Sequence, residues 1–465
     1  MSTGRPHPNL GEIIIATQVT TSSISHRRAR NIVFLLAASV GIVMTGFGII
    51  MPIFARRLGE MGSGVQELGL MTMAFALAAL LASPPMGALA DRVGRRPLVL
   101  LALSSFVAVN IAFLFAPSTE VFIAIRVVEG VLTAGLMPAA MGVVADIIPE
   151  SQRAQRVGIV MGAMGSGLIF GPVIGGVLYD GLGFAAPFIA SAAMASVAFV
   201  FALILVPETR TREVRRREAL RQRRTVTASQ AVSESRWGFV PRPLYLFGTL
   251  LVLDFVIVFE YTFIEPQMIF YFYNDLGWST VQFGVVVATS GVAIVVGQAL
   301  LGRWSDKIGR KPIIVLGALL FTSLPGALAF VTWFPLMMLF AATAGLGLAL
   351  IMPALTAFYI DITAEQHRSR IHGIKSSAAS LGGVLGPLLL MGATALMAPR
   401  GVFISAGVLL GVTALLALIV LKEPSRAGSE AADQEWDWSS GRATVAQATL
   451  RGIVARAQTA RQRVG

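Results

Sequence analysis

Apolar residues fill twelve long runs of this chain, and short polar segments separate the runs. An α-helix needs about 20 mostly apolar residues to cross the hydrocarbon core of a bilayer, and each run has that length. The runs cover residues 31–55, 67–90, 97–116, 120–146, 156–180, 183–206, 243–272, 281–303, 312–331, 335–361, 370–397 and 400–421. Several connections are so short that the helices on either side must be antiparallel neighbours. The pattern predicts an all-α membrane protein with twelve transmembrane helices.

The composition agrees with this interpretation. Hydrophobic residues make up 55% of the chain and charged residues 13%, whereas soluble proteins carry about 25% charged residues. A low charge suits a chain in lipid, because a charged side chain at the bilayer centre costs about 2.5–3.5 kcal/mol on insertion scales. The chain has no cysteine, which excludes disulfides, thiolate metal sites and thiol catalysis. The four histidines lie in the tails or near a loop, so we expect no metal site inside the membrane.

The basic residues predict the orientation. With the N-terminus in the cytoplasm, the outer loops hold only Arg56, Arg57 and Arg400. The inner loops hold a larger set: Arg92, Arg95, Arg96, Arg153, Arg156, Arg303, Lys307, Arg310, Lys311, Arg368 and Arg370. Because cytoplasmic loops are enriched in lysine and arginine, we expect a multi-pass protein of the cell (inner or plasma) membrane with both termini in the cytoplasm. The net charge of +12 is thus a signal of topology and of contact with anionic lipid, and no nucleic-acid partner is expected.

The spacing of the runs predicts two halves of six helices each, at residues 31–206 and 243–421. A basic linker at residues 207–242, with ten arginines against four glutamates, joins them and is interpreted as a cytoplasmic tether. Residues 1–30 and 422–465 are interpreted as cytoplasmic tails.

A loop motif between apolar runs occurs twice, 215 residues apart. It reads Gly87-Ala-Leu-Ala-Asp91-Arg-Val-Gly94-Arg95-Arg96-Pro97 in the first copy and Gly302-Arg-Trp-Ser-Asp306-Lys-Ile-Gly309-Arg310-Lys311-Pro312 in the second. The same offset relates Asp146 to Asp361, Glu150 to Glu365, and Gly171-Pro172 to Gly386-Pro387. One register through several helices predicts two parallel repeats, an arrangement that in transporters places the binding site between the halves.

These motifs resemble those of the major facilitator superfamily, and within it of the twelve-span drug:proton antiporters, over about residues 31–421. The first loop copy matches the superfamily signature Gly-x-x-x-Asp-Arg-x-Gly-Arg-Arg in full, and Arg126-Val-Val-Glu129-Gly130 matches the fourth-span signature. The fifth span matches the antiporter signature at Gly158, Gly167, Gly171, Pro172, Gly175 and Gly176. The resemblance implies a major facilitator fold in two pseudo-symmetric six-helix halves.

The resemblance also implies a role for the first loop in conformational change. Gly87 and Gly94 have no side chain, so a neighbouring helix can approach the turn closely. Asp91, next to Arg92, is expected to face the positive N-terminal end of the eleventh span and to help close the inner gate.

Acidic residues at the inner end of the fourth span are the expected partners of this loop. Arg95 is expected to pair with Asp146 and Glu150, and the second copy repeats the cluster with Asp306, Arg310, Asp361 and Glu365. A static clamp that only orients the helices is the alternative to a gate.

Charged residues inside the spans are candidates for function, because intramembrane charges are costly. Arg126 and Glu129 lie three residues apart on one face of the fourth span, where the resemblance implies that Arg126 tunes a protonatable carboxylate. A purely structural ion pair is the alternative.

The seventh span carries Asp254, Glu260 and Glu265. Helical spacing puts Asp254 and Glu265 on one face and turns Glu260 elsewhere. We expect Asp254 and Glu260 to exchange protons or attract a cationic substrate, with Phe259 among the aromatic residues of an adaptable cavity. Glu265 could instead face outer water, and Lys375 is expected to extend to the inner surface.

We interpret the chain as an exporter of amphipathic, drug-like small molecules in exchange for protons, working by alternating access. The expected partners are a small-molecule substrate, protons and the lipid bilayer, and a monomer is the expected state. Proton-coupled uptake of sugars or organic acids is the alternative, and the fifth-span glycines argue against it. A third interpretation is a sensor or lipid-surface protein that does not transport. We expect no enzymatic activity and no cofactor, since the sequence has no nucleophile–base pair, metal cluster or phosphate-binding Gly-x4-Gly-Lys-Ser/Thr loop.

Overall fold

The computed structural model describes residues 26–206, 208, 240–241, 243–302, 304–363 and 367–422. Within these ranges every regular element is a helix. The expected tails and linker fall almost wholly outside the described residues, so the boundaries drawn for them stay a prediction.

The twelve predicted spans are confirmed within the described residues, with ends that shift by a few residues. The first six are α2 (His26–Glu60), α3 (Val65–Val93), α4 (Arg95–Leu114), α5 with α6 (Thr119–Thr133 and Leu136–Ile147), α7 (Glu150–Leu182) and α8 (Ala185–Leu205). The other six are α10 with the π-helical turn η1 (Leu244–Phe270 and Tyr271–Asp275), α11 (Thr280–Leu301), α13 with α14 (Arg310–Phe321 and Ser323–Phe330), α15 (Phe334–Ile362), α16 (Arg368–Leu396) and α17 (Pro399–Val420). The short α12 (Trp304–Ile308) lies in the second copy of the repeated loop.

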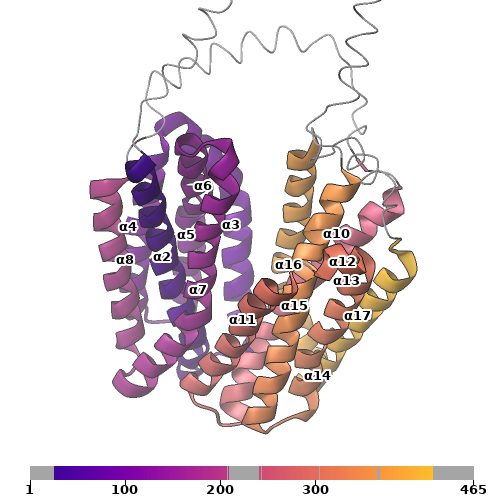
Figure 1. The fold of residues 1–465 in the computed structure, drawn as a ribbon. Coiled ribbons are helices and arrows are strands. Elements are labelled where there is room, and N and C mark those ends of the chain that lie inside the picture. Colours follow the sequence, from indigo (N-terminus) through magenta and orange to yellow (C-terminus); the bar gives the residue numbers. More distant parts are fainter. Residues whose placement is uncertain are drawn as a thin grey trace, which may run out of the picture.

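The helices form two bundles with the same internal arrangement, as the repeat predicts (Figure 1). In the first bundle, α2 packs on α7, α3 on α5 and α4 on α8. The equivalent pairs of the second bundle are α10 with α16, α11 with α15, and α13 with α17. The fold is therefore the predicted pair of pseudo-symmetric six-helix halves.

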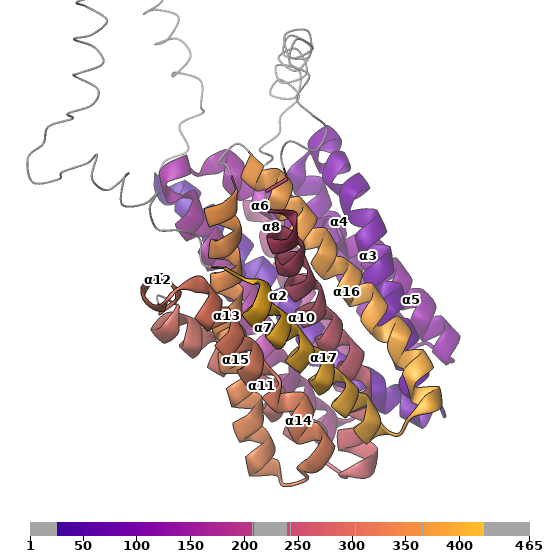
Figure 2. The same cartoon turned by 90° about the vertical axis from the view of Figure 1, so that its right-hand side faces the viewer.

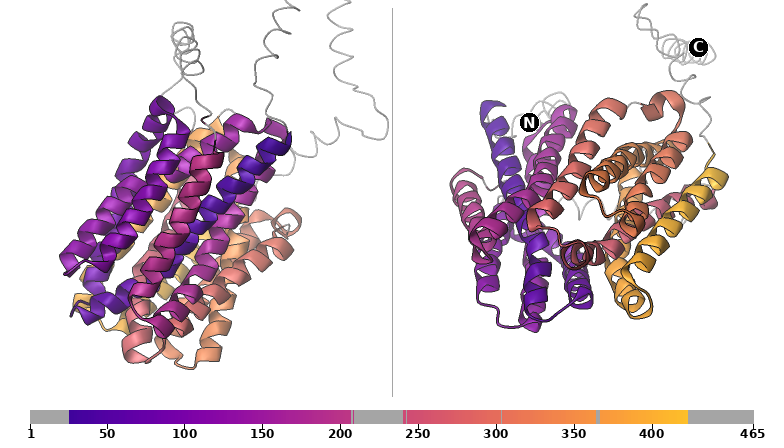
Figure 3. Two further views of the ribbon diagram at one scale, coloured as in Figure 1. Left: turned by 90° about the vertical axis from the view of Figure 1, so that its left-hand side faces the viewer. Right: turned by 90° about the horizontal axis from the view of Figure 1, so that it is seen from below.

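The two ends of the bundle differ in how the halves meet. We call the end where α8 finishes and α10 begins the linker end, at the top of Figure 1, and the opposite end the far end. The backbones of the two halves diverge toward the linker end and come together toward the far end. The view from the far end shows helices of both halves side by side (Figure 3).

Two helix pairs join the halves, namely α7 with α11 and α3 with α16. Small residues allow the first pair to touch backbone to backbone: a Cβ atom added at Gly176 would lie 2.7 Å from Val281 Cα, and one added at Gly284 would lie 2.5 Å from Pro172 O. In the second pair, Gly69 of α3 packs on Met391 and Pro387 of α16, which lies along the face of its half in Figure 2.

The glycines of α7 divide into two groups. Gly167, Gly171 and Gly175 lie against the backbone of α2, within one half, and Gly176 lies against α11. Gly158 and Gly162 pack on neither helix, because a Cβ atom at either would meet nothing within 4 Å. Only the second part of the glycine signature, from Gly167 to Gly176 and including Pro172, is therefore a packing surface.

The repeated loop also differs from expectation at one glycine. A Cβ atom at Gly87 would meet nothing within 4 Å, so the close helix approach predicted there is absent in this arrangement. Gly94 is needed for its backbone, because its φ of +126° is one that other residues rarely adopt.

The close contact between α7 and α2 gives a first prediction. Replacing Gly175 by alanine puts a methyl group against the backbone of Ile49, which has no rotamer to escape, so Gly175→Ala should lose about 1–3 kcal/mol of stability through overpacking. Gly165→Ala is the matched control on the same helix, because the space around Gly165 is open and alanine favours the helix by about 1 kcal/mol. Thermal unfolding of the purified protein in detergent should give a lower midpoint for Gly175→Ala and an equal or higher one for Gly165→Ala. Equal midpoints for the two variants would contradict the packing described.

Candidate functional site

Three carboxylates of α10 are buried inside the second half or at its inner face. Asp254 and Glu265 are each 4% exposed and Glu260 is 1% exposed. The sequence left open that Glu265 faces the water outside the cell. The structure excludes this, because the side chain is enclosed. All three acids of the seventh span therefore need a partner or a proton.

Asp254 shares its surroundings with a lysine of α16. The Nζ atom of Lys375 lies 3.7 Å from Oδ1 of Asp254 and donates a hydrogen bond of 3.0 Å to Thr356 Oγ1 on α15. The lysine also lies 5.4 Å from the centre of the Tyr359 ring. Lys375 thus turns inward and connects three helices, whereas the sequence predicted that it extends to the membrane surface.

Glu260 is the most isolated of the three acids. Neither of its carboxylate oxygens has a hydrogen-bond partner in the part of the chain that the structure describes. About three helical turns further on, Tyr271 of η1 lies on the same face and packs on Phe403 of α17 at 5.3 Å between ring centres, which places Glu260 toward the interior of its own half. Phe259, the neighbouring candidate, is buried in a row of stacked rings with Phe255 and Phe263.

The first half holds a buried ion pair on α5. Arg126 Nη1 lies 2.6 Å from Glu129 Oε2, and both side chains are less than one-tenth exposed. The guanidinium lies 4.7 Å, 5.1 Å and 4.0 Å from the ring centres of Phe47, Phe54 and Phe75 on α2 and α3. Aromatic faces attract a cation, so the rings stabilise the arginine where water is absent. The Nε atom of Arg126 has no hydrogen-bond partner among the described residues.

Glu265 connects this ion pair to the second half. It is close enough to Arg126 of the first half for an electrostatic interaction. Tyr261, one turn earlier on α10, donates a hydrogen bond of 3.4 Å to Glu265 Oε1. Arg126 therefore binds a carboxylate in its own half and acts electrostatically on a second one in the other half.

The repeated loops form equivalent clusters at the linker end. In the first half, Arg95 Nε binds Asp146 Oδ2 at 2.9 Å, and Asp91 lies 3.8 Å away. In the second half, Arg310 binds Asp361 at 3.1 Å and also pairs with Asp306. The side chain of Glu150 and the whole of Glu365 lie outside the described residues, so their pairing stays a prediction.

Glu208 adds a contact that the sequence did not suggest. Its carboxylate accepts hydrogen bonds from the backbone N–H groups of Arg95 and Arg96, at 3.1 Å and 3.3 Å. These are free donors at the start of α4, where a negative charge is favourable. The first acidic residue after α8 is thereby fixed to the repeated loop. Asp91 and Arg92 belong to the same turn, and their role at the eleventh span stays a prediction.

The far end carries a set of contacts between the halves that sequence reasoning missed. Arg56 of α2 donates to Trp278 O at 2.7 Å and lies 3.7 Å from the ring centre of Tyr273. Tyr273 in turn donates to Pro52 O at 3.3 Å, and Val281 N donates to Asp180 Oδ2 at 3.0 Å. Nothing in the sequence distinguishes Arg56 from its neighbour Arg57, which binds Glu60 within its own helix at 3.0 Å.

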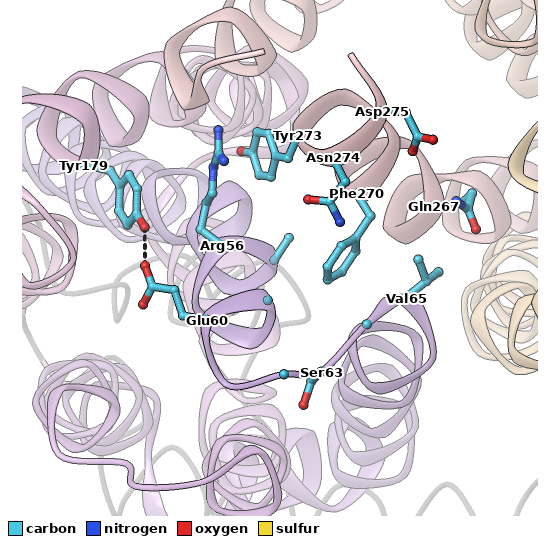
Figure 4. Close-up of a pocket in the computed structure, with 14 residues that line it drawn as sticks. Arg56, Glu60, Ser63, Val65, Tyr179, Gln267, Phe270, Tyr273, Asn274 and Asp275 are labelled. Atoms are coloured by element: carbon cyan, nitrogen blue, oxygen red, sulfur yellow. Dashed lines mark hydrogen bonds between the residues drawn. The ribbon is translucent and has the colours of Figure 1, made fainter. Parts of the chain in front are cut away.

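These contacts border a polar cavity of about 710 Å³ between α2, α3, α7 and the end of α10. Figure 4 shows Arg56 and Tyr273 on one side of it, and Glu60 accepting a hydrogen bond of 2.7 Å from Tyr179. We call Arg56, Tyr273, Asp180 and their backbone partners the far-end latch.

Comparison with known proteins identifies the family. The sequence model of the Major Facilitator Superfamily matches residues 33–267 and 250–459. The chain belongs to the Major Facilitator Superfamily. Membership in this family of transporters agrees with the predictions that the chain is a transporter and not an enzyme.

Several bacterial relatives match most of the chain. It is 27% identical over 361 residues to "Multidrug resistance protein 2" of Bacillus subtilis, covering 77% of this chain and 88% of the relative. It is 24% identical over 358 residues to "Quinolone resistance protein NorA" of Staphylococcus aureus, with the same two coverages. The crystal structure of a D-xylose-proton symporter superimposes with a TM-score of 0.66 at 16% identity, over 84% of this chain and 98% of that one, which shows the shared fold.

The ion pair of α5 gives a second prediction. Arg126→Met leaves Glu129 buried without its partner, and the loss of one member of a buried pair costs about 3–5 kcal/mol. The double variant Arg126→Met/Glu129→Leu removes both charges and should recover most of that loss. Thermal unfolding midpoints of Arg126→Met, of Glu129→Leu and of the double variant measure this coupling. A double variant that is less stable than both single variants would contradict it.

The far-end latch gives a third prediction. Gln267 is 5% exposed and lines the far-end cavity, so a single cysteine there in this cysteine-free chain reports on opening of the far end. Arg56→Ala removes a charged hydrogen-bond donor, worth about 1.5–3 kcal/mol, and should raise the rate of maleimide labelling of Gln267→Cys about tenfold.

Arg57→Ala is the matched control for this experiment. Arg57 has the same charge, and its contacts with Glu60 and with Phe184 stay within the first half. Equal labelling rates in the Arg56→Ala and Arg57→Ala backgrounds would show that the latch does not hold the far end closed.

Proposed function

We propose that this transporter exports amphipathic, drug-like small molecules from the cytoplasm in exchange for protons. Two named relatives are resistance proteins, one for multiple drugs and one for quinolones, and they cover more than three quarters of the chain. The positive-inside rule favours an orientation in which the arginine-rich linker end and both termini lie in the cytoplasm, and the bacterial relatives favour the plasma membrane. The observation that carries proton coupling is the unpartnered carboxylate of Glu260 within a membrane-spanning helix.

Glu260 and Asp254 are the proposed proton-carrying groups of the second half. A buried carboxylate without a hydrogen bond or counter-charge is costly, and taking up a proton removes its charge. Glu260 has neither kind of partner among the described residues, and Asp254 shares a single lysine with Thr356. A change in the packing of α10 against α16 or α17 would change what surrounds both acids, and this links their protonation to conformation.

Arg126 is the proposed connection between the halves. Its guanidinium binds Glu129 and also acts on Glu265 across the interface. If Glu129 or Glu265 took up a proton, Arg126 would interact mainly with the acid that stays ionised. A proton arriving at Glu265 would therefore weaken the attraction between Arg126 of α5 and Glu265 of α10. The three phenylalanine rings keep the arginine in place during this exchange.

Alternating access then uses the two ends of the bundle in turn. In the described arrangement the halves touch at the far end, through the latch and the close pairs α7–α11 and α3–α16, and they diverge at the linker end. We propose that this is the state open to the cytoplasm, in which substrate enters. If the linker end closed, the Arg95 cluster would approach the second half and the Arg310 cluster would approach the first half. The far-end latch would then open.

The glycine surface favours export over uptake. Gly167, Gly171 and Gly175 fix α7 to α2, and Gly176 brings α7 to α11 at the interface of the halves. This surface matches the antiporter signature of the fifth span, so the uptake alternative is less well supported.

The experiment that tests the proposal is ethidium efflux from cells that lack their main exporters, with and without a protonophore. The expected result is efflux that the protonophore stops. Glu260→Gln and Asp254→Asn should reduce the energised efflux at least tenfold, because an amide cannot carry the proton. The same variants, reconstituted without a proton gradient, should still exchange substrate across the liposome membrane.

Glu120→Gln is the control for these variants, because Glu120 is an exposed carboxylate at the far end of the same fold and should be replaceable without loss. Energised efflux at the wild-type rate in Glu260→Gln, with the protein present in the membrane, would remove Glu260 from the mechanism. Efflux of the wild type that persists with the protonophore would contradict proton coupling itself.

A further inference from the structure

A second cavity, of about 410 Å³, lies between α15 and α16 at the linker end of the second half. Its polar lining is Thr356 and Tyr359 from α15, Thr363 directly after this helix, and Arg368, His372 and Lys375 from α16. None of the described residues that line it has a carboxylate. Small-molecule sites in proteins enclose about 300–1,000 Å³, so the cavity can hold a small ligand or the headgroup of a larger one.

One hydroxyl group in the wall lacks a partner. Thr363 is 6% exposed, and its Oγ1 atom has no hydrogen-bond partner within the described residues. The hydroxyl of Tyr359 differs, because it lies next to the carboxylate of Asp254. Buried polar atoms of side chains are nearly always hydrogen-bonded to protein, water or ligand. The buried hydroxyl of Thr363 therefore points to an acceptor that belongs in the cavity.

The charges around the cavity define what that acceptor is. Lys375 stands at the inner wall, where Asp254 balances part of its charge at 3.7 Å. Arg368 and His372 are exposed at the wall, and His372 is also close enough to Asp254 for an electrostatic interaction. The cavity thus combines basic side chains with a hydroxyl donor, and these are the groups that bind carboxylate and phosphate.

We propose that this cavity binds the carboxylate or phosphate group of an amphipathic anion. Arg368 and Lys375 supply the charge, Thr363 donates a hydrogen bond, and Ile360 and Ile371 contact the apolar part. The anion is either a free molecule or the headgroup of an anionic lipid, since both present the same oxygens. The site goes beyond proton-coupled export, and its occupancy is measurable without transport.

The test is calorimetric titration of phenyl phosphate into the purified full chain in nanodiscs of phosphatidylcholine. The wild type should bind it, and Arg368→Gln and Thr363→Val should each weaken the affinity at least fivefold. Thr363→Val keeps the shape of the side chain and removes only the hydroxyl. Arg370→Gln is the control, because it removes the same charge from the same helix but Arg370 does not line the cavity.

A second set of nanodiscs containing phosphatidylglycerol distinguishes the two sources. If a lipid headgroup fills the site, the anionic lipid should raise the unfolding midpoint of the wild type more than that of Arg368→Gln, and it should weaken phenyl phosphate binding. If the occupant is a free anion, the affinity for phenyl phosphate should be the same in both lipids. The proposal is overturned if phenyl phosphate does not bind in either lipid and the anionic lipid gives Arg368→Gln the same midpoint shift as the wild type. It is also overturned if Arg370→Gln weakens binding as much as Arg368→Gln.

Discussion

Charge buried inside a membrane-spanning helix is the constraint on which this structure depends. An ionised group away from water needs a counter-charge, hydrogen bonds or a polarisable neighbour, and the two halves meet this need in different ways. The first half surrounds Arg126 with Glu129 and three phenylalanine rings. The second half gives Asp254 a lysine at 3.7 Å and leaves Glu260 without a partner among the described residues. The first half therefore holds a charge that its neighbours stabilise, and the second half holds carboxylate charges that a proton can neutralise.

The internal repeat supplies the scaffold but not this chemistry. The Arg95–Asp146 pair at 2.9 Å recurs as Arg310–Asp361 at 3.1 Å, so the linker ends of both halves are built alike. The intramembrane charges have no such counterparts. The residues 215 positions after Arg126 and Glu129 are Ala341 and Ala344, and those 215 positions before Asp254 and Glu260 are Ser39 and Thr45. The two six-helix halves share one architecture and differ in their buried charges. They can therefore move against each other while protons act on only one of them.

The sequence alone predicts those features that follow from local or periodic rules. The twelve spans follow from apolar length, and the arginine–aspartate clusters follow from the repeat. The sequence does not predict the contacts of a side chain when they depend on which helices pack together. Glu265 is buried and lies within electrostatic range of Arg126 in the other half. Lys375 turns inward, toward Asp254 and Thr356. Gly158 belongs to the same signature as Gly175, yet only Gly175 has a helix backbone against it. Arg56 and Arg57 are neighbours in sequence, and only the packing of α2 against the end of α10 separates their roles.

We propose that the acids of α10 carry the protons that are exchanged for substrate, and proton release on substrate binding tests this most directly. Ethidium is added to the purified protein in weakly buffered solution, and the pH change is recorded at several starting pH values. The account predicts that the wild type releases protons when the substrate binds, and that Glu260→Gln combined with Asp254→Asn binds the substrate with little or no release. Substrate binding to the wild type without any release of protons, across the whole pH range, would contradict the account.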